Sequence, residues 1–235
     1  MAGYKRVLIK LSGEALAGEK KTGFDEATCI EVAGQIKKIL ENGTQVAIVI
    51  GGGNFWRGRT SETIDRYKAD QIGILATVMN CIYVSDIFRY CGMQTSIYTP
   101  FELSDMADVF SKDRAVSDLS EGKVVFLAGG TGHPYFSTDT ATALRAIELD
   151  CDVIMMAKAI DGVYSADPKT DPSAVKYDRI SMKEVVEKNL KVIDATASAL
   201  CLENKMPLLI FSLAEDNSIV NNAAGQNSGT VVYVD

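Results

Sequence analysis

The amino-acid sequence predicts an α/β protein, a single three-layer α/β/α sandwich with a mainly parallel central sheet, built as one domain from residues 1–235. Runs of apolar, β-branched residues recur along the chain, and segments with helical periodicity separate them, which is typical of parallel strands joined by crossover helices. The chain has 47% apolar and 23% charged residues, a composition that suits a globular core. No repeat, low-complexity stretch or Pro/Ser-rich linker divides it.

Seven apolar runs are expected to form the strands of this sheet. They cover residues 6–10, 45–50, 94–99, 123–128 and 152–156, with shorter strands at 208–212 and 230–234. Most of them are rich in Val and Ile, as expected for strands that are buried on both faces.

Two long helices are expected in the first half of the chain. Asp25 is the expected N-cap of the first, which ends at Asn42-Gly43, and no helix is expected between the first strand and Asp25. The second covers residues 70–90 and ends at Gly92. Its inward residues are expected to be Ile74, Val78, Cys81, Ile82 and Ile87. We expect its apolar residues to belong to the core rather than to a subunit contact.

Capping residues also mark the later helices. Thr138 or Asp139 is expected to cap a helix that runs to about residue 149. Ser181 and Glu184 have the spacing of a capping box, and Asp194 is expected to cap a helix through residue 204.

Charge and cysteine usage exclude several classes of protein. The chain has 24 Lys and Arg residues and 31 Asp and Glu residues, which gives a net charge of −7. This negative charge argues against a nucleic-acid partner bound through a general basic surface. The five cysteines form neither a C-x-x-C motif nor a metal-finger spacing, so we expect small core residues of a reduced compartment. With no signal segment and no run of 18 apolar residues, we expect a cytoplasmic protein with no membrane partner.

The carboxyl ends of the first and second expected strands carry residues that suit phosphate groups. In open α/β sheets, ligands bind beyond the carboxyl ends of the strands. The first strand ends in Lys10-Leu11-Ser12-Gly13, where a cation stands beside a glycine turn. A P-loop is excluded, because Glu19 stands where that loop has its lysine.

The second strand runs into three glycines at residues 51–53, with Arg57 shortly after. Glycines there permit close approach of a ligand to the backbone. The alternative is a tight turn that needs glycine for steric reasons alone.

Two further strand ends combine turns with polar side chains. Residues 129–139 join a glycine loop and hydroxyl groups to the start of a helix, which suits an anion or a nucleotide. Plain N-capping is the alternative for Thr138 and Asp139, and an exposed loop residue is the favoured interpretation of His133. After the fifth strand, Lys158 precedes Tyr164, whose ring is a candidate to face a purine. Together these features predict a nucleotide phosphotransferase.

Five motifs, in order, resemble those of the bacterial uridylate (UMP) kinases of the amino-acid-kinase superfamily. They are KLSGEAL, VIGGGN-x-x-RG, D-x-x-G-x-LATVMN, TG-x-P-x-F-x-TD and DGVY-x-ADP, and the resemblance covers nearly the whole chain. It implies an amino-acid-kinase-like fold and the reaction of UMP with ATP and Mg²⁺ to give UDP, in pyrimidine nucleotide synthesis. It also implies a homohexamer, activation by GTP and inhibition by UTP.

The resemblance also implies roles for individual residues. The ATP site would include Lys10, Leu11, Ser12, Gly13, Gly53, Arg57, Lys158, Tyr164 and Asp167. The UMP site would include Gly52, Asp70, Thr131, Gly132, His133, Pro134, Tyr135, Phe136, Ser137 and Thr138. Lys10, Asp139 and Asp194 would be catalytic, with the two carboxylates organising lysine side chains and metal, and no residue is assigned as a metal ligand. The response to GTP would involve residues 18–23.

Two positions depart from the family. Members often have Thr or Asn where this chain has Lys158, which either contacts the ATP phosphates or replaces a neighbouring lysine. His133 stands where others often have Asn, which fits a role of the backbone better than one of the imidazole. The chemistry does not need histidine, because a phosphate monoester, with a second pKa of about 6, is already ionised at neutral pH.

Two alternatives remain at this point. A sister phosphotransferase of the same fold would act on a carboxylate, a carbamate or isopentenyl phosphate, although the TG-x-P-x-F-x-TD run favours UMP. A nucleotide-sensing or oxyanion-storage protein would bind ligand without producing ADP. The retention of Lys10, Arg57 and Asp70 favours turnover.

Overall fold

The computed structural model describes residues 3–56, 63–190, 192–226 and 228–235. The strands of its main sheet are β1 (Arg6–Leu11), β2 (Gln45–Ile50), β3 (Thr95–Thr99), β4 (Asp108–Val109), β5 (Val124–Leu127), β6 (Val153–Lys158), β9 (Arg179–Ser181), β10 (Leu208–Ser212) and β11 (Thr230–Tyr233). They lie in the order β4-β3-β5-β2-β1-β6-β10-β11-β9, and β10 with β11 is the antiparallel pair in an otherwise parallel ladder.

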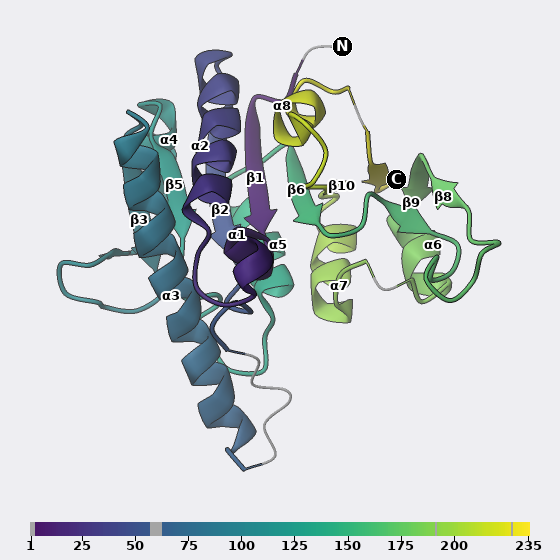
Figure 1. Cartoon of the computed structure of the whole chain (residues 1–235), viewed down its shortest axis with the longest axis horizontal. Coiled ribbons are helices and arrows are strands. Elements are labelled where there is room, and N and C mark those ends of the chain that lie inside the picture. The colour runs from purple at the N-terminus through teal and green to yellow at the C-terminus, as the bar shows by residue number, and fades with distance from the viewer. Residues whose placement is uncertain (1–2, 57–62, 191, 227) are drawn as a thin grey trace.

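Helices cover both faces of this sheet (Figure 1). One face packs against α1 (Gly13–Ala17), α2 (Glu26–Glu41), α3 (Arg66–Tyr90) and α8 (Ser218–Ala223). The other packs against α4 (Lys112–Ser120), α5 (Thr138–Glu148), α6 (Met182–Glu187) and α7 (Ala195–Glu203). The predicted three-layer α/β/α architecture with a mainly parallel sheet is therefore confirmed.

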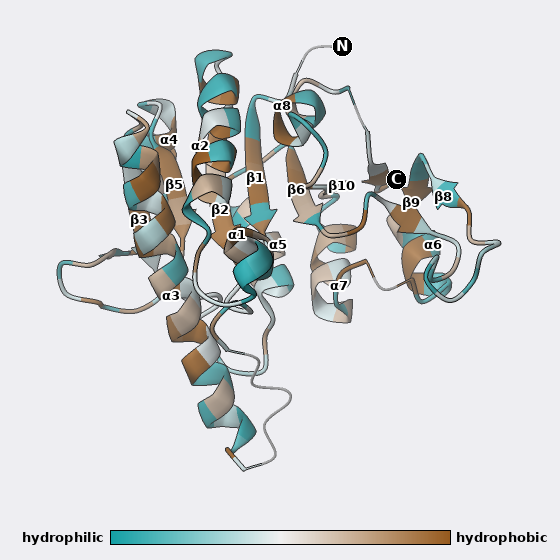
Figure 2. Cartoon of the chain, viewed as in Figure 1, coloured by the Kyte–Doolittle hydropathy of each residue, from teal (hydrophilic) through white to brown (hydrophobic). Residues whose placement is uncertain are grey.

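The alternation of side chains along β1 shows how one strand supplies two cores. Val7 and Ile9 are buried with α2 and α3, whereas Leu8 is buried with α5 and α7. Lys10 follows on the same side as Leu8, because side chains two residues apart point to the same face of a strand. Figure 2 shows the central strands of the main sheet as largely hydrophobic, whereas the helices around them carry both hydrophobic and hydrophilic residues.

Most predicted elements are present, with shifted ends. β2 and β10 have the predicted bounds, and Asp25, Ser181 and Asp194 cap their helices as predicted, each accepting a hydrogen bond from a backbone N–H of the first turn. The long helix begins four residues before the predicted Asp70, because Asp65 is its N-cap. The predicted caps of the third helix are wrong, since Ser137 has that role.

The prediction that no helix precedes Asp25 is also wrong. α1 begins directly after β1, and the 3₁₀ turn η1 (Gly18–Lys20) follows it. Five helical residues are too few to show a helical period in a sequence. The predictions also omitted β4, β9, α4, α8 and the separate hairpin of β7 (Val163–Tyr164) and β8 (Lys176–Tyr177). These elements are short or, like α4, mostly polar.

The cysteines are core residues, as predicted. Within the described chain all five are free thiols, and all but Cys91 are buried. Burial raises the pKa of Cys81 to about 12 and that of Cys151 to about 12, so these thiols stay protonated at neutral pH.

By length and composition α3 qualifies as a membrane span, but its packing is that of a core helix with one free side. Val78, Cys81, Val84 and Phe88 are buried against the sheet. Of the predicted inward residues, Val78 and Cys81 are therefore correct, whereas Ile82 is exposed.

Candidate active site

Two lysines lie near the carboxyl ends of neighbouring parallel strands. Lys10 pairs in register with Met156 on β6, and Lys158 is the last residue of that strand. The β1 and β6 arrowheads point to the same edge of the sheet, where α1, α5 and α7 gather (Figure 1). Strand geometry thus brings two cations, which are 148 positions apart in sequence, to one site.

Lys10 forms an ion pair with the first turn of α5. Its Nζ lies 3.2 Å from Oδ1 of Asp139, and both side chains are mostly buried. Asp139 is available for this contact because Ser137 caps the helix instead, its Oγ accepting from the backbone N–H of Asp139 at 3.0 Å and of Thr140 at 3.1 Å. The predicted catalytic residues Lys10 and Asp139 are therefore in direct contact.

Asp194 joins α7 to α5 through hydrogen bonds. Oδ1 accepts from the N–H of Ala197 at 3.0 Å and from the Thr140 hydroxyl at 3.0 Å, and the Ser137 hydroxyl donates to Oδ2. Burial raises the pKa of Asp194, but these hydrogen bonds to its ionised form outweigh burial and leave the pKa lowered. Asp194 is therefore a carboxylate that fixes the start of α5.

Lys158, at the end of β6, is a largely enclosed cation. Its Nζ donates to the carbonyl of Val192, and burial is the main cause of its lowered pKa. Lys10 lowers that pKa further, whereas Asp139 and Asp194 raise it. Lys10, Lys158, Asp139 and Asp194, which we call the Lys/Asp cluster, thus act on one another electrostatically.

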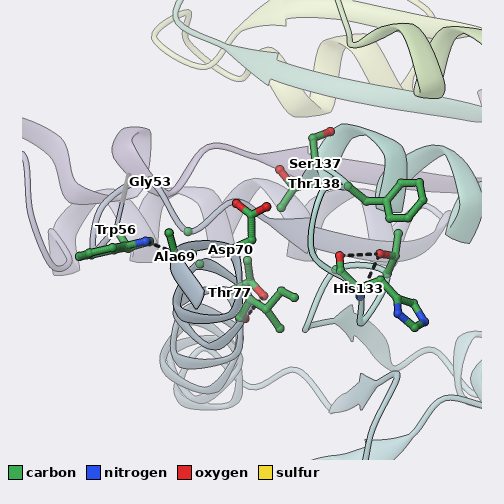
Figure 3. A pocket seen from close by; sticks show the side chains of 14 residues that line it. Gly53, Trp56, Ala69, Asp70, Thr77, His133, Ser137 and Thr138 are labelled. Carbon is green, nitrogen blue, oxygen red and sulfur yellow. Dashed lines mark hydrogen bonds between the residues drawn. The ribbon is translucent and has the colours of Figure 1, made fainter. Parts of the chain in front are cut away.

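A cavity of about 300 Å³, shown in Figure 3, is lined by Ser137 and Thr138, the two residues that precede Asp139 of the Lys/Asp cluster. Its lining includes these predicted UMP residues: Gly52, Asp70, Thr131, His133, Phe136, Ser137 and Thr138. Gly132, Pro134 and Tyr135 do not line it, and Gly53, predicted for ATP, does. The His133 imidazole is exposed and turned away from Asp70 in Figure 3, in agreement with the loop interpretation.

Asp70 points into this first cavity from α3. Its Oδ2 accepts from the N–H of Tyr135 at 2.9 Å, and the Arg66 guanidinium lies 3.8 Å from the same oxygen. Tyr135 has a φ of 72°, an uncommon conformation for a residue other than glycine. That conformation aims its N–H at Asp70 and holds the carboxylate over the cavity.

A second cavity of about 420 Å³ lies between the β7–β8 hairpin and the segment after α6. It is lined by the predicted ATP residues Lys158, Tyr164 and Asp167. The Tyr164 hydroxyl donates to Asp161 at 2.9 Å, and Oδ1 of Asp167 accepts from the N–H of Lys169 at 3.0 Å. Lys188 and Asn189 also line this cavity.

Close packing requires glycine at one position in each of the two predicted phosphate loops. A Cβ on Gly13 would lie 2.3 Å from the carbonyl oxygen of Gly51, and one on Gly52 would lie 2.9 Å from that of Gly73 on α3. Close packing therefore accounts for glycine at Gly13 and Gly52 and brings the two loops against each other, whereas a Cβ on Gly51 would meet no atom closer than 3.7 Å. Leu11 has its side chain in the core, and Ser12 is the N-cap residue of α1 without a side-chain capping bond. Arg57 lies outside the described residues.

Sequence reasoning missed two polar residues that build the first cavity. The Thr77 hydroxyl accepts from the N–H of Gly129 at 2.9 Å and donates to the Ile74 carbonyl, which ties the residue 129–137 loop to α3. The Trp56 indole donates to the carbonyl of Ala69 at 2.8 Å. Thr77 lies in the quoted LATVMN motif, which was the signal available for it.

The model of the amino acid kinase family matches residues 5–212. The chain belongs to the amino acid kinase family. It is similar to a UMP kinase structure from Bacillus anthracis, with a TM-score of 0.95 and 35% identity over 99% of this chain and 97% of the other. It is also similar to a UMP kinase structure from Ureaplasma parvum, with a TM-score of 0.92 and 35% identity over 97% of this chain and 98% of the other. A uridylate kinase structure from Archaeoglobus fulgidus is similar with a TM-score of 0.73 and 28% identity over 96% of this chain and 99% of the other.

These matches confirm the resemblance to UMP kinases that the five motifs predicted. Among the described residues, no group of three His, Cys, Asp or Glu side chains is arranged to hold a metal ion. The carboxylates nearest the lysines are Asp139, which is paired with Lys10, and Asp194, which is occupied by hydrogen bonds.

We expect the stability cost of Lys158 to depend on pH. Its pKa in the folded chain is below the ordinary value of 10.5, so between the two values the unfolded chain binds more protons and the free energy of unfolding rises with pH. Lys158→Met removes this dependence. The stability of the wild-type chain relative to Lys158→Met should therefore increase from pH 7 to pH 10.5, as measured by urea unfolding.

Lys183→Met is the matched control, because the Lys183 side chain is 76% exposed. Its stability relative to the wild type should change little over the same range. A difference between wild type and Lys158→Met that stays constant or falls with rising pH would contradict the assignment of Lys158 as a desolvated cation.

Proposed function

We propose that this protein is an ATP:UMP phosphotransferase that forms UDP, as a single amino-acid-kinase-like domain. The observation that carries the proposal is the position of the Lys/Asp cluster between two cavities. Ser137 and Thr138 line the first and precede Asp139, while Lys158 lines the second. The full-length similarity to proteins described as UMP kinases supports UMP as the acceptor.

In this proposal, UMP occupies the first cavity. Asp70 accepts hydrogen bonds from the ribose hydroxyls, because Tyr135 uses only one of its oxygens among the hydrogen bonds described for the carboxylate. The residue 131–138 loop encloses the base and the phosphate, which lies toward the N-terminus of α5. Gly52 lets the acceptor approach the backbone.

ATP occupies the second cavity, with Tyr164 and Asp167 beside the adenosine and Lys158 toward the phosphates. Lys10, Ser12, Gly13, Gly53 and Arg57 complete the phosphate side. A bound Mg²⁺ would supply additional positive charge at the ATP phosphates, and phosphate oxygens would be its main ligands because no cluster of three carboxylates is arranged to hold it among the described residues.

Catalysis then consists of positioning and charge neutralisation. The acceptor phosphate is ionised at neutral pH, since its second pKa is about 6, so no general base is needed. The main barrier is repulsion between two polyanions, which Lys10 and Lys158 offset. Asp139 holds the Lys10 ammonium in place through the 3.2 Å ion pair.

The proposal extends to the setting of the enzyme. We infer a cytoplasmic homohexamer of pyrimidine nucleotide synthesis, activated by GTP and inhibited by UTP. A coupled assay of ADP release tests the activity with UMP, CMP, a carboxylate, carbamate and isopentenyl phosphate as acceptors. We expect turnover with UMP and Mg·ATP at least 10-fold above every other acceptor, faster with GTP and slower with UTP.

Two results would contradict this assignment. UMP binding without ADP release would indicate a sensing or storage protein. Preferred turnover of another acceptor would indicate a sister phosphotransferase. A rate that does not change with GTP or UTP would contradict the proposed regulation by these nucleotides, but not the proposed kinase activity.

Lys10→Ala is expected to lower kcat by about 100-fold or more, because preorganised positive charge is worth most in the transition state. The KM for UMP should change less than about 3-fold, since Lys10 does not line the first cavity. Steady-state kinetics measure both values. Lys37→Ala, at an exposed position of α2, is the control. A near-normal kcat in Lys10→Ala would contradict the assignment of Lys10 as a catalytic residue.

The exposed side of α3 is the proposed subunit contact. Ile72, Leu75, Met79 and Ile82 are 37 to 51% exposed and follow one another at helical spacing, so they form one apolar stripe. For these four residues the exposure contradicts the expectation that the apolar residues of the helix belong to the core, an expectation that holds for Val78, Cys81, Val84 and Phe88. In sedimentation, we expect a hexamer for the wild type and smaller species for Leu75→Glu/Met79→Glu.

Lys183→Glu, on α6, is the control for the added charge and should remain hexameric. A monomeric wild type would overturn the proposed assembly, and a hexameric double variant would exclude this stripe from the contact.

A further inference from the structure

Two buried asparagine side chains form a reciprocal pair beneath the phosphate loops. Asn54 is 1% exposed and Asn80 is 0% exposed. Nδ2 of Asn54 donates to Oδ1 of Asn80 at 3.0 Å, and Nδ2 of Asn80 donates to Oδ1 of Asn54 at 2.8 Å. The pair links the segment after β2 to the middle of α3.

Each amide donates a second hydrogen bond to a different backbone segment. Asn80 donates to the Gly51 carbonyl at 2.7 Å, and Asn54 donates to the Gly23 carbonyl at 2.8 Å. The N–H of Gly23 returns a bond to the Asn54 carbonyl at 3.3 Å. Since carbonyls only accept, the orientation of both amides is fixed and all four side-chain N–H groups are used.

The pair also lies directly against Gly13. A Cβ on that glycine would come within 2.4 Å of Oδ1 of Asn54 and 3.0 Å of Nδ2 of Asn80. The same two side chains therefore touch both predicted phosphate loops, residues 10–13 and residues 51–53. Neither asparagine lines the first or the second cavity, so neither is placed to contact a substrate.

We propose that the Asn54–Asn80 pair is a positioning element that sets the spacing of the two phosphate loops for phosphoryl transfer. This inference rests on the proposed kinase function. Removing either amide leaves buried polar groups unpaired, and the loops relax to satisfy them. Substrates would still bind in cavities built by other residues, but the reacting phosphates would be held at an unproductive distance.

The test is the steady-state kinetics of Asn80→Ala and Asn54→Ala with UMP and Mg·ATP. A displacement of about 1 Å at a reacting centre costs about 100-fold in rate, so we expect kcat to fall at least 10-fold. The KM values for UMP and ATP should stay within about 3-fold of wild type. Asn54→Ser, which keeps a hydroxyl donor, should recover part of kcat. If an alanine variant fails to fold, the kcat and KM values of Asn54→Ser test the positioning role in its place.

Asn222→Ala is the matched control for buried amide loss. Asn222 is 0% exposed and donates to the Ser218 carbonyl at 2.8 Å within α8, and neither cavity of the site contains it. A general loss of stability would lower the melting temperature of this variant as well. We expect its kcat to remain near the wild-type value at a temperature where all variants are folded.

A kcat in Asn80→Ala and Asn54→Ala that matches Asn222→Ala would overturn the positioning role. Hydrogen exchange provides a readout that is independent of turnover, and peptides containing residues 10–13 and 51–53 should exchange faster in Asn80→Ala than in Asn222→Ala. Unchanged exchange in both loops would equally count against the inference. Absence of ADP release from the wild-type protein would instead overturn the proposed kinase function, while the exchange result would still decide whether the pair fixes the loops.

Discussion

The ion pair of Lys10 with Asp139 is the contact on which the arrangement of the site depends. It joins a central strand to the first turn of α5, across the boundary between sheet and helix layer. Its geometry requires Ser137 to take the capping position, because a capping Asp139 would be turned toward its own helix. Asp194 then fixes Ser137, so one charge contact depends on a chain of hydrogen bonds that reaches α7.

The two lysines are held by different means, which gives them different electrostatic properties. Lys10 has a carboxylate partner, whereas Lys158 has a backbone carbonyl and is surrounded by protein. The charges of Asp139 and Asp194 offset only part of this desolvation, so an anion that enters beside Lys158 stabilises its ammonium further. Polyphosphate binding would therefore relieve an existing electrostatic cost at Lys158.

The sequence was sufficient for the order of the long strands and helices, although not for the short elements between them, and for most of the residues at the strand ends. Lys10 and Asp139 were found because parallel strands direct their carboxyl ends to one edge, whereas Asp70, which lies in α3, was found through the resemblance to the UMP kinase motifs. The choice of Ser137 as N-cap was not accessible, since Ser137, Thr138 and Asp139 are all competent caps and the tertiary contact with Asp194 decides among them. The Asn54–Asn80 pair was missed for a similar reason, because it joins residues from a loop and from the middle of a helix.

The continuous α3 helix has a consequence for how this architecture can diverge. Its inner side carries Gly73 and Ala76 against the glycine loop, and Asp70 at the cavity, while Leu75 and Met79 project from its outer side. Inserting or deleting one residue inside the helix would rotate everything beyond it by about 100° relative to the rest, exchanging inner for outer positions. A change in length is therefore tolerated better in the loops, such as residues 129–137 at the first cavity, than within this helix.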